Sequence, residues 1–474
     1  MTHFDPAKNK VLFGSTDKLA DWIAEDTDQS KIIDKIKLML KNYLELDNVS
    51  FLFGSGTSIH LGAVAIRNFP IEIEKYIIGQ NLEREFFSII EELQSDLVGD
   101  KADKTVFKDG RGWDCIVDES IYRDNVSKEI AIEFEKVLNY LIAKDFVLNE
   151  DKSQERTDKI NELITTIKEG LFEVCDLERR SVSKEIIKRK KESAFTKEQA
   201  QGELLESRSK YIFHEKFLKA LLQRPLNLRR ANIFTANYDL AFEYAFDKLG
   251  VHYIDGFSGF HKRFFKPETF EYDIFYPGST TSGKVQRIEK VVRYYKLHGS
   301  LSWVNSESRD ANNLYGIEEK PLELIASLEK KGEIIIYPSA VKKSYTLDLP
   351  YSELFRQFAS TITQSQSVLV TVGYSFGDDH FNDIIYQALS NPTFTLIVID
   401  FQGTQNEYIN NLKELNDPRI IILEGEFFGD FLTFADTLMP NFNNVDNNEN
   451  VANTLNELLS TKASNNEPTK DAEA

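Results

Sequence analysis

The sequence contains little cysteine and no long hydrophobic run. Only Cys115 and Cys175 occur among 474 residues, too few for a disulfide framework or a four-cysteine zinc site. No apolar stretch reaches the length of about 18 residues that a transmembrane helix needs. The first residues, MTHFDPAKNK, lack the apolar core of a secretory signal. We therefore expect a cytoplasmic protein without a membrane span or a structural metal.

Positive charge is scarce as well. The chain has 57 Lys and Arg against 76 Asp and Glu, a formal net charge of −19. Such a surface repels phosphate backbones, so direct nucleic-acid binding would need a segregated basic patch. The best candidate is KEIIKRKKE, residues 184–192, which we interpret as the solvated face of a helix whose Ile186 and Ile187 turn inward. We expect no direct contact with nucleic acid.

The residues that are present have the composition of an ordinary globular protein, 41% hydrophobic and 28% charged. Continuous β-branched runs suit parallel strands that helices bury on both faces. Several short apolar runs end in Gly, Asn, Asp or Ser: VSFLFGSG, NIFTANYD, RYYKLHGS, EIIIYPS, SVLVTVGYS, FTLIVID and RIIILEG. Amphipathic stretches such as DLAFEYAFDKLG lie between them. The pattern predicts an α/β fold with a doubly wound, mostly parallel, Rossmann-like sheet.

One long segment, residues 71–225, departs from this pattern, because helical spacing replaces the strand signal. One apolar helix face is formed by Ile130, Phe134, Val137, Leu138 and Leu141, and ELITTIKEGLFEV behaves likewise. We predict a large all-helical insertion here. Residues 1–70 would hold N-terminal helices and the first strand with its glycine loop, and residues 226–440 the remainder of the α/β domain. Residues 441–474 are rich in Asn and are predicted to be disordered.

Polar residues collect where the predicted strands end, which is where open α/β sheets bind ligands. Gly54-Ser55-Gly56-Thr57-Ser58 follows the first strand. Glycines let the backbone approach a pyrophosphate, and the amides and hydroxyls that follow can bind its oxygens. A tight strand-to-helix turn accounts for the same residues equally well, because a lone Gly-x-Gly is weak evidence.

The next predicted strand ends in FTANYD, with Asn237 and Asp239. Asn237 is either a turn former or a side chain whose amide orients a sugar hydroxyl or a water. Asp239 either braces Asn237 or caps the helix that follows.

A third strand ends in KLHGSLSW, with His298 followed at once by Gly299. A single histidine among seven is more often structural than catalytic. A neutral imidazole is nevertheless the usual general base near neutral pH, and Gly299 leaves space for a ligand.

The stretch VTVGYSFGDDHFND brings Gly373, Ser375 and Phe376 to another strand end. The Asp378-Asp379-His380 run that follows offers metal ligands in principle. We favour the start of a helix, because aspartate there complements the helix dipole. Asp400, directly after the buried run LIVI, suits adenosine ribose hydroxyls, as in dinucleotide-binding folds.

Taken in order, these motifs resemble the sirtuin family, and most of all the bacterial sirtuin-like proteins of antiphage defence. The family's Gly-Ala-Gly-x-Ser loop is similar to Gly54 to Ser58, and its Thr-Gln-Asn-Ile-Asp stretch to Thr235 to Asp239, with Ala236 in the glutamine place. Its His-Gly matches His298-Gly299, and its Gly-Thr-Ser matches Gly373 to Ser375. The resemblance covers roughly residues 45–70 and 226–437, about half of the chain.

The resemblance implies chemistry on NAD. Deacylating sirtuins carry a four-cysteine zinc module that this chain cannot build, whereas zinc-free relatives in defence systems hydrolyse NAD to nicotinamide and ADP-ribose. It therefore implies an NAD glycohydrolase without zinc, in which Asn237 and His298 are catalytic. The residues implied to bind NAD are Gly54, Ser55, Gly56, Thr57, Ser58, Thr235, Asp239, Gly373, Ser375, Phe376 and Asp400. The alternatives are an NAD-dependent protein deacylase and a non-catalytic scaffold that senses NAD or ADP-ribose.

The predicted insertion also bears on partners. Its length far exceeds the strand-to-helix connections of about 2 to 6 residues that are usual. Apolar helix faces of that size need covering, so we expect a homo-oligomer. The resemblance adds a separate HerA-type ATPase as partner. A self-inhibitory lid accounts for the insertion equally well.

Overall fold

The structure is a computed structural model. It describes residues 4–25, 28–64, 73, 76–77, 140–141, 143–144, 154–178, 210–276, 286–306, 312–325, 350–401 and 406–442. Most of the predicted helical insertion, including Ile130 to Leu138, the run EIIIYPS, the basic run 184–192 and the tail beyond residue 442 lie outside the described residues. No helix in the described ranges is long and apolar enough to cross a membrane.

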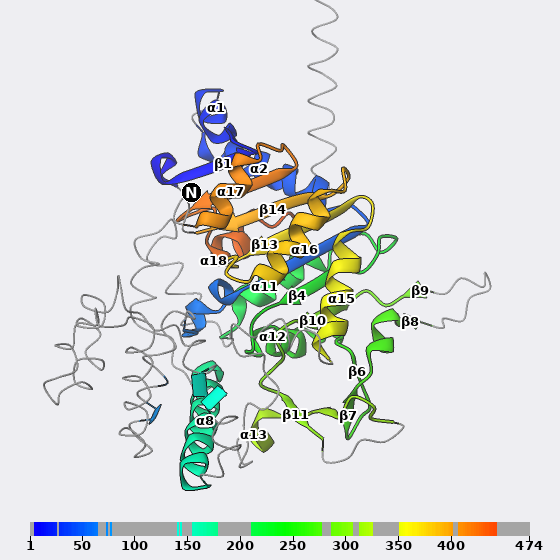
Figure 1. Ribbon diagram of the computed structural model, residues 1–474. Coiled ribbons are helices and arrows are strands. Elements are labelled where there is room, and N and C mark those ends of the chain that lie inside the picture. Colours follow the sequence, from blue (N-terminus) through cyan, green and yellow to red (C-terminus); the bar gives the residue numbers. More distant parts are fainter. Residues whose placement is uncertain are drawn as a thin grey trace, which may run out of the picture.

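A nine-stranded sheet forms the centre of the molecule (Figure 1). Its order is β2-β1-β15-β14-β13-β3-β4-β10-β5. The bounds are β1 Asn9–Phe13, β2 Thr16–Asp17, β3 Asn48–Phe53, β4 Asn232–Thr235, β5 His252–Ile254, β10 Val291–Lys296, β13 Ser367–Val372, β14 Thr395–Asp400 and β15 Ile420–Gly425. Six of the seven predicted runs are strands of this sheet, which confirms the doubly wound α/β fold.

The connections between these strands explain where a ligand can bind. Apart from the short edge strand β5, the parallel strands run β10-β4-β3-β13-β14-β15 across the sheet, which is third, second, first, fourth, fifth and sixth along the chain. The chain reverses its direction of winding between β3 and β13. In open α/β sheets, ligands bind at such a switch point, outside the carboxyl ends of the strands.

Helices cover both faces of the sheet because successive strand residues point to opposite sides. Phe51 and Phe53 of β3 belong to one core, and Leu52 between them belongs to the other. Burial of each such side chain contributes about 1.5–3 kcal/mol. The first core contains α1 Lys18–Glu25, α2 Gln29–Leu44, α11 Ile212–Leu221, α12 Ala241–Leu249, α18 Phe431–Thr433 and η9 Phe434–Leu438, and the second contains α15 Tyr351–Ile362, α16 Asp379–Leu389 and α17 Glu407–Glu414.

A smaller antiparallel sheet lies beside the main one, with the order β11-β12-β7-β6. Its strands are β6 Phe257–Ser258, β7 Arg263–Phe265, β11 Trp303–Asn305 and β12 Ile317–Glu319, and a further pair is formed by β8 Phe275–Tyr276 and β9 Gln286–Arg287. Aromatic rings of the four-stranded sheet pack against one another: the ring centroid of Trp303 lies 5.1 Å from that of Phe257 and 6.2 Å from that of Phe265. Short 3-10 helices complete the fold, η1 Pro6–Lys8, η2 Ser55–Thr57, η3 Ile59–Leu61 and η7 Pro267–Glu271.

One long helix of the predicted insertion is described. The run ELITTIKEGLFEV lies within α8, Gln154–Cys175, as predicted. Figure 1 shows α8 below the main sheet, beside α13 (Leu322–Ile325). Its buried face shares a hydrophobic cluster with Tyr238, Leu301 and Leu322. Helix α11 also falls within residues 71–225, but it packs on the main sheet.

The sequence did not predict the amino-terminal strand β1. It pairs antiparallel with β15, so that Val11 lies opposite Leu423 and Leu12 opposite Ile422. The run NKVLF is short and its partner lies some 400 positions away, and local periodicity carries no information on such a pairing.

Candidate active site

Three glycines bring two strand ends together at the switch point. Gly54 and Gly56 follow β3, and Gly373 follows β13. The N–H of Gly56 donates to Gly373 O at 2.9 Å. A Cβ on Gly56 would lie 2.6 Å from Gly373 Cα, and Gly373 itself has a φ of +59°. These glycines therefore serve a close approach of two backbones. Whether a pyrophosphate lies over them stays a prediction.

Asn237 lies at the end of the adjacent strand β4 and its side chain is held firmly. Nδ2 donates to Gly54 O at 3.1 Å, and it lies 3.3 Å from Thr57 Oγ1 and 3.4 Å from Ser58 Oγ. A carbonyl oxygen can only accept, so Gly54 O fixes which end of the amide faces the loop. Asn237 Oδ1 accepts no hydrogen bond from any residue that the structure describes. It is available to a ligand.

The hydroxyls of the glycine loop have internal partners. Thr57 and Ser58 are fully buried, whereas Ser55 is exposed. Thr57 Oγ1 donates to Gly54 O at 2.8 Å. Ser58 bonds to the carboxylate of Asp239, which also accepts from the N–H of Ala241 at 3.0 Å. Burial raises the pKa of Asp239, and the Lys296 ammonium and these two hydrogen bonds oppose that rise.

His298 lies beyond the end of β10, near the turn between β4 and α12 that carries Asn237 (the Asn237 turn). The ring of Tyr238, the residue after Asn237, is 6.3 Å from the His298 ring. His298 Nε2 lies 3.1 Å from Asp378 Oδ2, within ion-pairing distance. The imidazole is almost buried and packs 5.1 Å from Phe381, between centroids. Its Nδ1 has no hydrogen-bond partner in the described part of the chain.

Asp378 belongs to the candidate site, although the sequence interpretation did not assign it there. Its Oδ1 accepts from the N–H of His380 at 3.1 Å, which confirms that the run Asp378-Asp379-His380 starts helix α16. Its other oxygen faces His298. The described residues contain no group of three or more His, Cys, Asp or Glu side chains that could hold a metal ion. The available signal was a helix cap residue two positions after the Gly-Tyr-Ser-Phe stretch, but only the fold brings Asp378 close to His298.

The remaining predicted site residues have mixed surroundings. Thr235 is buried and its Oγ1 accepts from the N–H of Asn237 at 3.0 Å, so it shapes the turn. Ser375 is exposed at the switch point. The Phe376 ring is buried and stacks on Tyr408 at 4.8 Å. Asp400 ends β14, two strands from β3. Their contacts with NAD stay predictions.

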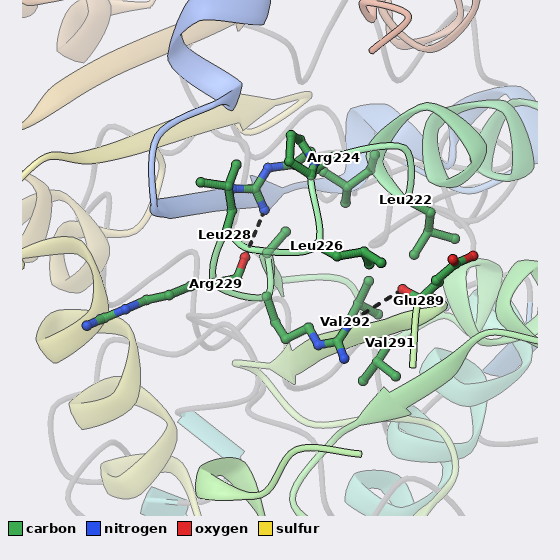
Figure 2. A pocket seen from close by; sticks show the side chains of 12 residues that line it. Leu222, Arg224, Leu226, Leu228, Arg229, Glu289, Val291 and Val292 are labelled. Carbon is green, nitrogen blue, oxygen red and sulfur yellow. Dashed lines mark hydrogen bonds between the residues drawn. The ribbon is translucent and has the colours of Figure 1, made fainter. Parts of the chain in front are cut away.

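A small cavity lies at the opposite end of the strands, before β4 and β10 (Figure 2). Its volume is about 30 Å³, and its wall includes Leu222, Leu226 and Leu228 beside Arg224. Arg224 donates to the carbonyls of Leu44, Leu46 and Arg229. This volume holds about one water molecule. The cavity therefore does not compete with the carboxyl ends of the strands as a substrate site.

Part of the chain matches a known protein family. Residues 231–416 match the family described as the SIR2-like domain. The match covers less than half of the chain and supports a sirtuin-like protein. SIR2-like domains bind NAD, so the match favours an NAD-dependent enzyme in general. The matched residues run from β4 past α17 and include Asn237, His298 and Asp378. No curated protein matches the chain.

Proposed function

We propose that the protein is an NAD glycohydrolase, which cleaves NAD with water to nicotinamide, ADP-ribose and a proton. The observation that carries this proposal is the pairing of Asn237 and His298 at neighbouring strand ends. The Asn237 amide is fixed by the glycine loop with Oδ1 left open, and His298 is held beside a carboxylate. The switch point of the sheet is where a dinucleotide would lie across both halves of the fold.

The two residues supply complementary chemistry. As the bond between nicotinamide and ribose breaks, positive charge develops on the sugar and water attacks its anomeric carbon. Asn237 Oδ1 accepts a hydrogen bond from that water or from a ribose hydroxyl and so orients it. With Nε2 beside Asp378, Nδ1 of His298 is the ring nitrogen left to take a proton from either group. The Asp378 carboxylate stabilises the imidazolium that forms.

The test follows NAD loss and nicotinamide release by the purified full-length protein. His298→Ala and Asn237→Ala should each lower kcat by about a hundredfold or more. His252→Ala, on the exposed side of edge strand β5, is the matched control and should leave kcat unchanged. Turnover should also survive EDTA. Near-normal turnover in His298→Ala contradicts the mechanism, and turnover only with an acetylated peptide indicates a deacylase instead.

The biological setting is part of the same proposal and rests on the family resemblance. We propose that the protein acts in antiphage defence by NAD depletion, as a homo-oligomer on a separate HerA-type ATPase. Light scattering after size-exclusion chromatography tests the first part, and a monomer at micromolar concentration contradicts it. Co-purification with an ATPase encoded beside the gene, with faster NAD loss in the complex, tests the second part.

A further inference from the structure

A buried ammonium group lies beneath the candidate active site. Lys296 is the last residue of β10, two positions before His298, and it is 4% exposed. Burial of a charge is costly unless it is paired and its donors are satisfied. Nζ donates to Glu243 Oε1 at 2.9 Å, to Tyr238 O at 3.2 Å and to Asp239 O. All three donors of the ammonium are used.

Two of these acceptors belong to the main chain that carries Asn237. Tyr238 and Asp239 directly follow Asn237 in the turn between β4 and α12. Hydrogen bonds from a charged donor are about twice as strong as neutral ones. An ammonium that holds two successive carbonyls fixes the peptide planes of this turn, and with them the direction in which Asn237 leaves the backbone.

The same region connects the Asn237 turn to the segment after β10 that carries His298 (the His298 turn). The carbonyl of Tyr238 also accepts from the N–H of Leu301 at 3.1 Å. Lys296 and Leu301 lie on either side of His298 in the chain, so the Asn237 turn is bonded to both flanks of His298. Glu243 in turn accepts from the Tyr294 hydroxyl at 3.0 Å, which fixes the counter-charge against the same strand β10.

We propose that Lys296 is a positioning residue that sets the Asn237 turn, and through Tyr238 O its spacing from the His298 turn, for reaction at this site. The kinetic part of this inference rests on the proposed NAD cleavage. In the proposed NAD cleavage, Lys296 contacts no reacting atom. Its role is to order the backbone from which Asn237 projects.

The experiment uses the full-length double variant Lys296→Met/Glu243→Gln. Gln keeps the length of Glu, Met is one atom shorter than Lys, and the two opposite charges are removed together, so no unpaired partner of this ion pair is left in the core. The control is Lys216→Met/Asp436→Asn, which removes the 2.6 Å ion pair between α11 and η9. For each protein, kcat and KM for NAD are measured, with the melting temperature and the deuterium uptake of peptides that cover residues 236–241.

In the double variant, kcat should fall by at least about tenfold while KM changes by less than about threefold. Residues 236–241 should exchange faster, by about tenfold, with the melting temperature within about 5 °C of wild type. The control should match wild type in all readouts. An unchanged kcat, or a lower kcat without faster exchange at residues 236–241, overturns the positioning role.

Failure of the proposed function gives a different result. If the wild-type protein does not cleave NAD, the glycohydrolase proposal is wrong. The role of Lys296 in ordering the Asn237 turn is then tested by the deuterium exchange alone. Faster exchange in the double variant and not in the control then supports the ordering of the Asn237 turn. Equal exchange in all three proteins overturns it.

Discussion

At the scale of single residues, the candidate site is built from groups that hold other groups. Gly54 O fixes the Asn237 amide, Asp378 faces the His298 imidazole, and Gly373 gives the glycine loop room to approach. A catalytic arrangement needs such supporting groups around the reacting side chains, because a misplacement of about 1 Å can lower the rate about a hundredfold. Two substitutions test it.

The first is Asp378→Asn. Asparagine caps a helix about as well as aspartate, so α16 should remain intact. The imidazolium of His298 loses its neighbouring carboxylate, and kcat for NAD cleavage should fall by about tenfold to a hundredfold. Asp379→Asn, at the exposed next position, should leave kcat unchanged. Equal kcat values in the two variants would remove Asp378 from the mechanism.

The second is Gly373→Ala, with Gly250→Ala as its control. Both glycines have a positive φ, +59° and +62°. An alanine Cβ at Gly373 would lie 2.8 Å from the backbone of Gly56, whereas nothing lies within 4 Å at Gly250. Gly250→Ala should cost about 1 kcal/mol of unfolding free energy for the backbone conformation alone. Gly373→Ala should cost at least about 2 kcal/mol more. Urea denaturation measures the difference, and similar losses would contradict close packing at the switch point.

At the scale of elements, α8 is the part of the predicted insertion that reaches the site. Its buried residues share one hydrophobic cluster with Tyr238, next to Asn237, and with Leu301, three residues after His298. The packing of α8 thus involves the residues next to Asn237 and His298. This contact suits both of the roles predicted for the insertion, since a lid and an assembly surface would each act through it.

Leu163→Ala tests the packing of α8. Leu163 is fully buried in the cluster, so truncation should lower the unfolding free energy by about 2–5 kcal/mol. Thr165→Ala, two residues along on the exposed face of the same helix, should change it by less than about 0.5 kcal/mol. Chemical denaturation followed by circular dichroism compares the two. A Leu163→Ala protein as stable as Thr165→Ala would mean that α8 does not pack as described.

At the scale of the whole molecule, the smaller sheet concentrates buried charge. The Arg263 guanidinium contacts Asp255 at 2.9 Å and also Glu319. One cation thus faces two carboxylates, of which Asp255 is buried and Glu319 is half-buried. Burial, together with the nearby Asp255, raises the pKa of Glu319 to about 8, while Arg263 and Lys296 oppose the rise and Glu243 adds to it. This sheet therefore makes the stability of the protein depend on pH.

The direction of this pH dependence follows from the pH range in which the folded and the unfolded protein each bind the Glu319 proton. The folded protein holds the Glu319 proton up to about pH 8, whereas the unfolded chain releases it near pH 4.5. Glu319 therefore stabilises the fold below pH 4.5, and its contribution is lost as pH rises toward 8. Glu319→Gln removes this titration, so its unfolding free energy should fall less between pH 5 and pH 8 than that of wild type. Glu318→Gln should retain the wild-type slope, and equal slopes in all three proteins would exclude Glu319.

The sequence alone determined the doubly wound, mostly parallel sheet, because buried parallel strands need continuous apolar runs and the runs of β3, β4, β10, β13, β14 and β15 are local. It also singled out Asn237 and His298, since strand ends carry polar residues only where something must be bound or turned. The tertiary structure decided what holds them. The contacts of Asp378 with His298, of Gly373 with Gly56 and of Lys296 with the Asn237 turn join residues about 60 to 320 positions apart, and the pairing of β1 with β15 spans still more. Such pairs are selected by burial and chain topology rather than by local spacing, and no periodicity in the sequence records them.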